Sequence, residues 1–148
     1  MAKVKDILAR KGRDVVTMVA DDAVLTAARL MNSRGIGGVV VLEDDEVVGI
    51  FTERDILRRV VAERRDPVTT VIRDVMTSPV FTCRPDATIE ECVALITEKR
   101  VRHIPVVDES GLSGIITSGD ILAYQVEEQA DTIQHLNRYV FDTRPVSP

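Results

Sequence analysis

The sequence predicts an α+β fold (α/β mixed) made of two similar halves related by a pseudo-twofold axis and packed through their sheets. Two observations carry this prediction. A nine-residue pattern occurs twice, as GIFTERDIL at residues 49–57 and as GIITSGDIL at residues 114–122. Sliding the chain against itself by 65 residues aligns residues 21–57 with 86–122 without a gap. An internal repeat of this kind indicates two copies of one supersecondary unit.

The aligned halves carry identical residues at nine positions, well above the number expected by chance. The pairs are Asp21/Asp86, Leu30/Leu95, Val41/Val106, Gly49/Gly114, Ile50/Ile115, Thr52/Thr117, Asp55/Asp120, Ile56/Ile121 and Leu57/Leu122. The repeating unit therefore predicts the order strand, helix, strand, strand, helix in each half.

The predicted strands come from apolar runs. Short strands are expected at residues 15–18 and 80–83, before the first helix of each half. Strand pairs are expected at residues 38–51 and 103–116, where two apolar runs flank an acidic or glycine-containing turn.

The first helix of each half follows from apolar residues at the spacing i, i+3, i+4, i+7. These are Val24, Ala27, Ala28 and Met31 in one half and Ile89, Cys92, Val93 and Ile96 in the other. Thr88 and Glu91 predict a capping box at the second of these helices, and Asp21 or Asp22 offers the corresponding cap at the first. Another helix is expected after each Thr-x-x-Asp sequence.

Neither half is large enough to cover both faces of its own sheet, so the halves are expected to pack sheet to sheet. The short segments VKDIL and IRDVM also resemble each other, at a slightly different offset. The predicted division is repeat 1 at 3–64, a linker at 65–71, repeat 2 at 72–126, a C-terminal helical extension at 127–141 and a flexible tail at 142–148.

The composition of the chain argues against several classes of binding partner. The formal net charge of −5 and an aromatic content of 3% argue against a nucleic-acid partner. No apolar run approaches the ~20 residues of a membrane span, and the N-terminus lacks a secretory signal, so we expect a cytoplasmic protein without a membrane partner. The basic stretches at residues 53–65 and 99–103 require either an anion or water around them.

Cysteine and histidine are too few for a metal centre. The chain has two of each, Cys83, Cys92, His103 and His135, and no CxxC motif, so no metal is expected. A disulfide between the cysteines is weakly favoured, and Cys92 is expected to be a buried thiol on an apolar helix face.

The Thr-x-x-Asp sequences allow two interpretations. Thr52 and Thr117 are good N-cap residues, with Asp55 and Asp120 at N3, so each turn could serve only to begin a helix. Alternatively, the carboxylate accepts the two hydroxyls of a ribose, while the helix N-terminus and the threonine serve a phosphate. The preceding glycine would allow a strand or a ligand to approach closely.

The repeat resembles a tandem pair of cystathionine β-synthase (CBS) domains, a Bateman module. The resemblance rests on the strand IPVVD at residues 104–108 and on the Gly-apolar-apolar-Thr-x-x-Asp turns at 49–55 and 114–120, and it covers about residues 3–126. It implies a free-standing CBS-domain protein that binds an adenosine ligand in the cleft between its repeats. AMP, ADP or ATP is the expected ligand, with NAD or S-adenosylmethionine as alternatives.

The resemblance also implies particular site residues. The primary site, on the second repeat, is expected to use Asp120 for the ribose, Thr117 for the ribose-phosphate junction, backbone groups of Phe81, Thr82 and Cys83 for the adenine edge, Val80, Ile104 and Pro105 for its faces, and Arg102 and His103 for phosphate. A weaker, secondary site on the first repeat is expected to contain Val16, Thr17, Gly38, Val39, Thr52, Arg54 and Asp55.

The first repeat departs from the pattern. Gly37 and Gly38 stand where the second repeat has Arg102 and His103, and a basic residue, Arg54, stands inside the turn. Each of the two basic residues also has a structural interpretation: Arg102 could be a solvated surface charge, and His103 could be a partly exposed residue at the start of a strand.

These features predict a regulatory sensor without catalytic activity that signals to an unknown downstream protein by a conformational change. No catalytic residues are expected, since the chain has no phosphate loop and no nucleophile-base set. One alternative is a structural protein that binds no ligand, and a less favoured one is a regulatory fragment related to IMP dehydrogenase. A homodimer through the outer helices is expected, because the final helix carries an apolar stripe of Leu122, Val126, Ala130, Ile133, Leu136 and Val140.

Overall fold

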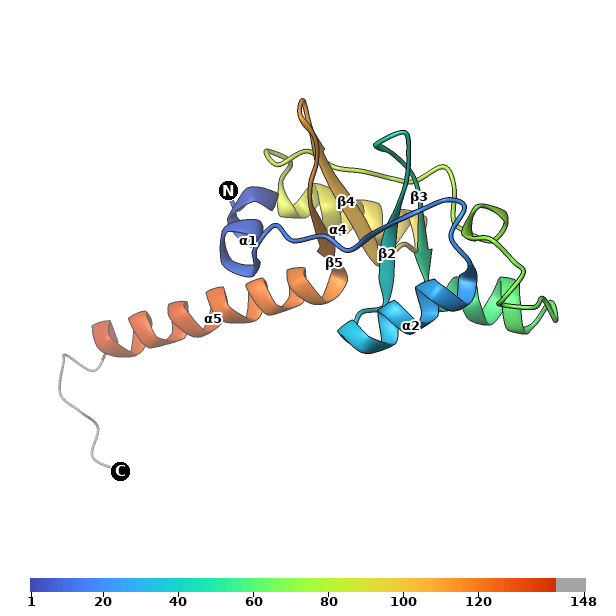
Figure 1. The fold of residues 1–148 in the computed structure, drawn as a ribbon. Coiled ribbons are helices and arrows are strands. Elements are labelled where there is room, and N and C mark those ends of the chain that lie inside the picture. Colours follow the sequence, from blue (N-terminus) through green and yellow to red (C-terminus); the bar gives the residue numbers. More distant parts are fainter. Residues whose placement is uncertain (141–148) are drawn as a thin grey trace.

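The computed structural model describes the backbone of residues 1–140, and their side chains except those of His135 and residues 137–140. The tail expected at 142–148 lies outside the described residues. Two β-hairpins stand side by side at the centre, with helices on their outer sides and one long helix that projects from the body (Figure 1). The mixed α+β class predicted from the sequence is confirmed.

The first half is built on a three-stranded sheet. β1 runs parallel to β2, and β2 pairs antiparallel with β3. Asp44 and Asp45 both have positive φ (52° and 61°) in the turn between β2 and β3, as a two-residue type I′ hairpin requires. The elements are β1 (Thr17–Val19), α2 (Val24–Arg34), β2 (Gly38–Glu43), β3 (Glu46–Thr52), the short helix α3 (Glu53–Asp55) and the π-helical segment η1 (Ile56–Val61).

The second half repeats this plan on a two-stranded sheet. β4 and β5 are antiparallel, and their register shifts between Val106 and Val107. β2 and β3 shift between Val41 and Leu42, which are the equivalent positions in the repeat, so the symmetry extends to a β-bulge. The elements are α4 (Ile89–Lys99), β4 (His103–Asp108), β5 (Gly111–Thr117) and α5 (Ser118–Val140). β3 and β5 contact each other, as expected for halves packed sheet to sheet.

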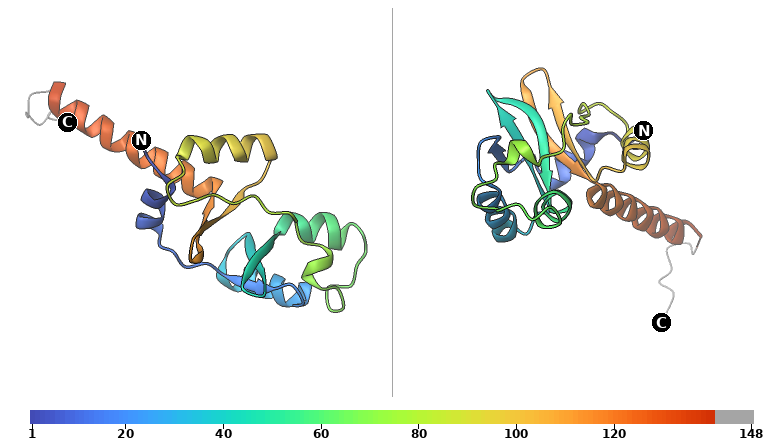
Figure 2. Two further views of the ribbon diagram at one scale, coloured as in Figure 1. Left: turned by 90° about the horizontal axis from the view of Figure 1, so that it is seen from above. Right: turned by 90° about the vertical axis from the view of Figure 1, so that its right-hand side faces the viewer.

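Two short segments pack on the opposite half from the one they precede. α1 (Val4–Lys11) contributes buried residues to the core of the second half and contacts β5 and α5. The 3₁₀ turn η2 (Ile72–Asp74) instead contributes Ile72 to the core of the first half. Figure 2 shows α1 beside the base of α5, far from α2. The chain thus ties its halves together by exchanging segments, while the division into repeats 3–64 and 72–126 stays a prediction.

The strand pairs are confirmed, the strand predicted at 15–18 lies at Thr17–Val19, and the one predicted at 80–83 does not form. There, Cys83 alone forms a bridge, with Val106, in place of a strand. The equivalent ladder in the first half uses the N–H of Val40, which donates to the carbonyl of Val16. Pro105 takes the position of Val40 and has no N–H to donate, so the ladder cannot extend.

The helix predictions need two corrections at their ends. Ala23, and neither aspartate, is the N-cap of α2, because the Asp22 carboxylate accepts from Val19 N instead. Thr88 Oγ1 does accept from Glu91 N at 3.1 Å, but the return bond of the predicted capping box is missing from the described contacts. Val93, expected on the buried face of α4, is 38% exposed.

The long helix α5 leaves the body after its first turns (Figure 1). Arg10 on α1 holds it there by ion pairs with Glu127 and Glu128, and by a contact with the ring of Tyr124. The predicted apolar stripe is exposed on both sides of these contacts, because Leu122, Val126, Ile133 and Leu136 are all more than half exposed. Val140, also predicted in the stripe, lies outside the described side chains. Among the described residues, no helix combines the length and apolar character needed to cross a bilayer.

Candidate functional site

Both Thr-x-x-Asp sequences begin a helix in the same way. Asp55 N donates to Thr52 Oγ1 at 3.3 Å, and Thr52 N donates to the Asp55 carboxylate at 3.0 Å. In the second half, Asp120 N donates to Thr117 Oγ1 at 3.1 Å, and Thr117 N donates back at 2.9 Å. The capping interpretation is therefore confirmed for both turns. The ligand interpretation depends on what else each carboxylate contacts.

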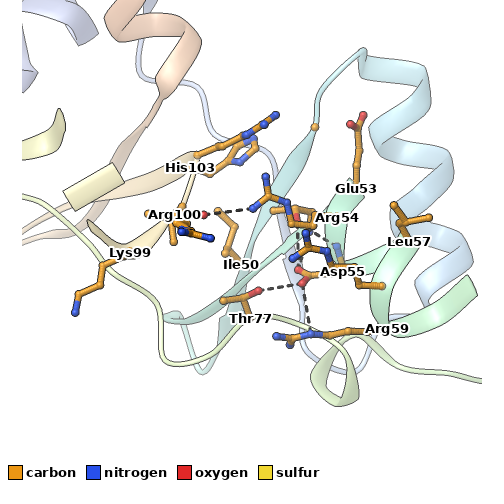
Figure 3. Close-up of a pocket in the computed structure, with 15 residues that line it drawn as sticks. Ile50, Glu53, Arg54, Asp55, Leu57, Arg59, Thr77, Lys99, Arg100 and His103 are labelled. Carbon is orange, nitrogen blue, oxygen red and sulfur yellow. Dashed lines mark hydrogen bonds and ion pairs between the residues drawn. The ribbon is translucent and has the colours of Figure 1, made fainter. Parts of the chain in front are cut away.

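Asp55 is enclosed by protein. It is only 5% exposed, and its Oδ1 accepts from Thr77 Oγ1 at 3.0 Å and lies 3.8 Å from Arg59 Nε. Its Oδ2 accepts from Thr52 N and Oγ1. Figure 3 shows Thr77 and Arg59 beside the Asp55 carboxylate. Both oxygens of Asp55 are therefore occupied by donors from the protein.

Asp120 lies in a more open position. Its side chain is 23% exposed, and Lys11 Nζ donates to Oδ2 at 2.6 Å. The same ammonium group donates to the carbonyl of Ile115 at 2.9 Å. Among the described contacts, every bond to Asp120 goes to Oδ2 or to the backbone, which leaves Oδ1 as the acceptor that a ligand hydroxyl could reach.

The glycines before the two turns make room for protein. A Cβ on Gly49 would lie 2.6 Å from Met76 Sδ and 2.9 Å from the carbonyl oxygen of Thr77, and one on Gly114 would lie 2.8 Å from a methyl group of Leu8. Leu8 belongs to α1, and Met76 and Thr77 belong to the segment 72–77 that contains η2, so both glycines meet an exchanged segment. Of the two predicted uses, close approach of another segment of chain is thus the one observed.

Two cavities lie between the halves, and each combines residues of both repeats. We call the first the Asp55 cavity; it has a volume of about 510 Å³. Its lining is Gly37, Ile50, Thr52, Glu53, Arg54, Asp55, Leu57, Arg58, Arg59, Thr77, Lys99, Arg100, Val101, Arg102 and His103.

The second, the Asp120 cavity, has a volume of about 500 Å³. Its lining is Lys11, Asp14, Val15, Val16, Gly35, Ile36, Gly37, Gly38, Arg102, His103, Ile115, Thr117, Ser118, Gly119 and Asp120. Gly37, Arg102 and His103 line both cavities, so the two spaces adjoin each other there. Both volumes fall in the range of small-molecule sites, roughly 300–1,000 Å³.

His103 forms the wall between the cavities. Its ring lies against the first half, where a Cβ on Gly38 would come within 3.2 Å of His103 Nε2. Burial lowers the pKa of His103, and the positive charge of Lys11 adds to this effect. The imidazole is therefore neutral at pH 7, when it can both donate and accept a hydrogen bond.

The structure groups the predicted site residues differently from the sequence. Thr117, Asp120, Arg102 and His103 share the Asp120 cavity as expected, but they are joined there by Val16 and Gly38 of the first repeat. Thr52, Arg54 and Asp55 line the other cavity. The remaining predicted residues line neither cavity, and they are Thr17, Val39, Val80, Phe81, Thr82, Cys83, Ile104 and Pro105.

These predicted residues lie outside the cavities for different reasons. Val39 and Ile104 are fully buried in the two cores, while Thr17 is exposed. Phe81 lies close to the Asp55 cavity, since the Lys99 ammonium is 5.5 Å from its ring centre. The predicted base-reading segment thus contacts a residue of the Asp55 cavity, although the sequence grouped it with Asp120.

Sequence reasoning missed several cavity residues. Lys11 was passed over because it lies in α1, far along the chain from Asp120. Arg58, Arg59, Lys99 and Arg100 belong to the two basic stretches that the sequence left unexplained. The basic residues are visible in the sequence, but only the packing of the two halves brings them to the same cavity.

The cysteines lie apart from both cavities. Cys92 is buried in the second core, as predicted, and both thiols are free. A hydrogen bond with Cys92, together with burial, raises the pKa of the Cys83 thiol. A raised pKa favours the thiol over the thiolate at neutral pH. No group of three His, Cys, Asp or Glu side chains suited to a metal ion occurs within the described residues.

Two repeated α+β units with paired cavities between them define the class of this protein, and comparison with known proteins agrees. The CBS domain matches residues 4–62 and 72–127. The mitochondrial CBS domain-containing protein CBSX3 of Arabidopsis thaliana is 31% identical over 146 residues, covering 93% of this chain and 71% of the relative. The chain belongs to the CBS domain family and contains a CBS domain pair, which is a regulatory module.

Solved structures show the same fold. A CBS-domain protein from Burkholderia ambifaria superposes with a TM-score of 0.83 at 38% identity, covering 86% of this chain and 96% of that one. The CBS domain pair of protein MJ0100, solved in complex with 5-methylthioadenosine and S-adenosyl-L-methionine, gives a TM-score of 0.77 at 25% identity. It covers 86% of this chain and 98% of the other.

Proposed function

We propose that this CBS domain pair is a non-catalytic sensor that binds an adenosine nucleotide in the Asp120 cavity and signals the change to a partner protein. AMP, ADP or ATP is the ligand that we expect first, with NAD and S-adenosylmethionine as alternatives. The complex of protein MJ0100 with two adenosine compounds supports this ligand class.

The observation that carries the proposal is the state of the Asp120 carboxylate. Asp120 lines the cavity, one of its oxygens is fixed by Thr117 N and Lys11 Nζ, and the other has no described partner. A carboxylate held in this way is oriented to accept a ribose hydroxyl, and the bond is charge-assisted. Thr117 and the N-terminus of α5 lie beside it, where a helix start favours a phosphate.

The rest of the Asp120 cavity has the composition that a nucleoside needs. Val15, Val16 and Ile36 supply an apolar wall for a base, and Arg102 lies near the junction with the other cavity, where it can meet phosphate. Asp14 also lines this cavity. Because a carboxylate can accept from a guanine amino group, GTP is the informative competitor in a binding assay.

Calorimetric titration with AMP, ATP, NAD, S-adenosylmethionine and GTP tests the proposal. We expect Asp120→Ala to weaken binding of the adenosine ligand by roughly 10- to 150-fold, the equivalent of one charge-assisted hydrogen bond. Glu46→Ala, which removes an exposed carboxylate at the start of β3, is the matched control and should bind as the parent does. Unchanged affinity of the Asp120 variant would refute the assignment, and GTP competing as well as ATP would refute the base preference.

We also propose a homodimer through the outer helices. Leu57 and Val61 on η1 are 62% and 63% exposed, and their repeat equivalents Leu122 and Val126 on α5 are 62% and 54% exposed. Pairs of exposed apolar residues at equivalent positions fit an isologous contact. Light scattering should show a dimer that Leu122→Glu/Val126→Glu converts to monomer. A parent chain that binds nucleotide as a monomer would exclude this interface.

The structural alternative and the IMP dehydrogenase-related alternative make different predictions. A purely structural dimer would show no thermal shift with any of the five nucleotides. A regulatory fragment related to IMP dehydrogenase would bind nucleotide and would also require a catalytic partner. We expect the sensor to act in the cytoplasm, and fractionation of the source cells tests that location.

A further inference from the structure

The Asp55 cavity has a strongly basic lining. The two basic stretches of the chain reach it from opposite repeats, on a protein whose formal net charge is −5. A cleft lined by one sign of charge concentrates ligands of the other sign. The basic residues are Arg54, Arg58, Arg59, Lys99, Arg100 and Arg102.

The internal repeat shows that the fold itself does not require these charges. At the 65-residue offset, five of the six basic residues have uncharged equivalents, and only Lys99 has a basic one, Arg34. The positions equivalent to Arg54, Arg58, Arg59, Arg100 and Arg102 are Gly119, Ala123, Tyr124, Gly35 and Gly37. Arg58 and Arg59 also stand on η1, whose π-helical geometry is often found at functional sites, whereas the equivalent part of α5 is a regular helix. The basic cluster is therefore particular to this cavity.

Two of these side chains have a carboxylate nearby, because Arg59 Nε lies 3.8 Å from Asp55 Oδ1 and Lys99 Nζ lies 3.7 Å from Glu98 Oε1. Arg54 Nη1 donates to the carbonyl of Arg100 at 3.3 Å, and Arg59 Nη1 donates to the carbonyl of Met76 at 2.6 Å. Within the described part of the chain, no ion pair involves Arg54, Arg58, Arg100 or Arg102. Figure 3 shows Arg54 and Arg59 on either side of Asp55.

The two carboxylates of the cavity do not cancel this charge at its centre. Asp55 is buried, and both of its oxygens are occupied by donors of the protein. Glu53 lies toward the His103 side, with its carboxyl carbon 3.7 Å from the position of a Cβ on Gly37. A ribose therefore finds no free carboxylate here, while phosphate oxygens find several guanidinium donors, which bind them in a bidentate manner.

We propose that the Asp55 cavity binds an oligophosphate chain through its arginine and lysine side chains, without recognising a nucleoside. This site goes beyond the adenosine site proposed above, because its own contacts are to phosphate and are made by residues other than Asp120. The oligophosphate is either a free anion or the phosphate tail of a nucleotide seated in the Asp120 cavity, since Gly37, Arg102 and His103 line both spaces.

Calorimetric titration of the full chain with sodium tripolyphosphate tests this site. Two double variants remove cavity charge from opposite repeats, Arg54→Gln/Arg58→Gln and Lys99→Gln/Arg100→Asn. Asn suits position 100, where φ is 55°. Each variant should weaken tripolyphosphate binding by roughly 10- to 100-fold, and higher salt should weaken it further. The control Arg29→Gln/Arg65→Gln removes the same charge from exposed positions outside both cavities and should bind almost as the parent does.

Two further titrations identify the source of the phosphate. If the anion binds independently, ATP and tripolyphosphate bind together and the Arg54/Arg58 variant leaves ATP affinity unchanged. If it is a nucleotide tail, tripolyphosphate competes with ATP, and the same variant weakens ATP more than AMP. Absence of tripolyphosphate binding, or equal binding by the parent and both cavity variants, overturns the proposal. Loss of adenosine binding alone would refute only the Asp120 site.

Discussion

The two Thr-x-x-Asp turns have the same local geometry and opposite surroundings. Asp55 is buried and both of its oxygens have donors, whereas Asp120 is partly exposed, lines a cavity and has one oxygen without a described donor. The difference comes from the exchanged segments: the first turn receives Thr77 and the second receives Lys11. A repeated motif therefore specifies a helix start, and the neighbouring segment decides whether its carboxylate supports the fold or is free for a ligand.

The largest expected effect is on stability, and it separates the two aspartates. Asp55→Ala leaves Thr77 Oγ1, Thr52 N and Arg59 without their acceptor in a buried place, which should cost roughly 2–4 kcal/mol of unfolding free energy. Asp120→Ala removes a partly exposed ion pair and the capping acceptor of Thr117 N, which should cost about 1 kcal/mol. Urea unfolding of both variants without ligand measures the difference.

Equal losses from the two substitutions would show that both aspartates act only as helix caps. In that case, the deeper burial of Asp55 would add nothing to the free energy of unfolding. Asp55→Asn is a useful companion variant, because it retains an acceptor for Thr77 and should recover part of the lost stability.

A smaller effect is expected at the two glycines that face the exchanged segments. In Gly49→Ala the new methyl group meets the Thr77 carbonyl at 2.9 Å, and this backbone group is fixed by its pairing with Ile50. In Gly114→Ala it meets only the end of the Leu8 side chain. We expect roughly 1–3 kcal/mol of destabilisation at Gly49 and less at Gly114, measured by thermal unfolding. A larger loss at Gly114 would mean that α1 is the more rigid of the two segments.

Much of the fold followed from the sequence because it is expressed in local patterns. The helix spacing, the apolar strand pairs and the Thr-x-x-Asp caps depend on residues close together in the chain, and the structure confirms them. The missing strand at residues 80–83 was also readable in principle, since Pro105 cannot donate to the ladder. Asp22 was misjudged because a local turn with Val19 competed for its carboxylate.

The site was harder to predict because it depends on contacts between distant segments. The sequence grouped Asp120 with Phe81, Thr82 and Cys83 by repeat, but the Asp120 cavity instead receives Val16 and Gly38 from the other repeat. Lys11, 109 residues from Asp120, gave no local signal. The basic stretches were visible as charge, and only the packing of the halves shows that they face one cavity.

The smallest expected effect is a pH dependence at His103, which separates the two cavities. Burial, with the charge of Lys11, lowers the pKa of His103 below its ordinary value of 6.5. As pH falls through 6.5, the unfolded chain binds a proton that the folded chain still refuses, so the folded state loses stability until the lowered pKa is passed. Glu53 and Asp120 oppose this shift and Arg102 adds to it, so the loss should be modest.

Urea unfolding between about pH 7.5 and 5.5 measures this loss, because most carboxylates titrate below that window. His103→Gln retains a hydrogen-bonding side chain of similar size but does not titrate, so its stability should vary less with pH than that of the parent. The control is His135→Gln, which removes the other histidine of the chain. The assignment fails if the parent and the His103 variant lose the same stability over this range, because the acid sensitivity would then belong to another group.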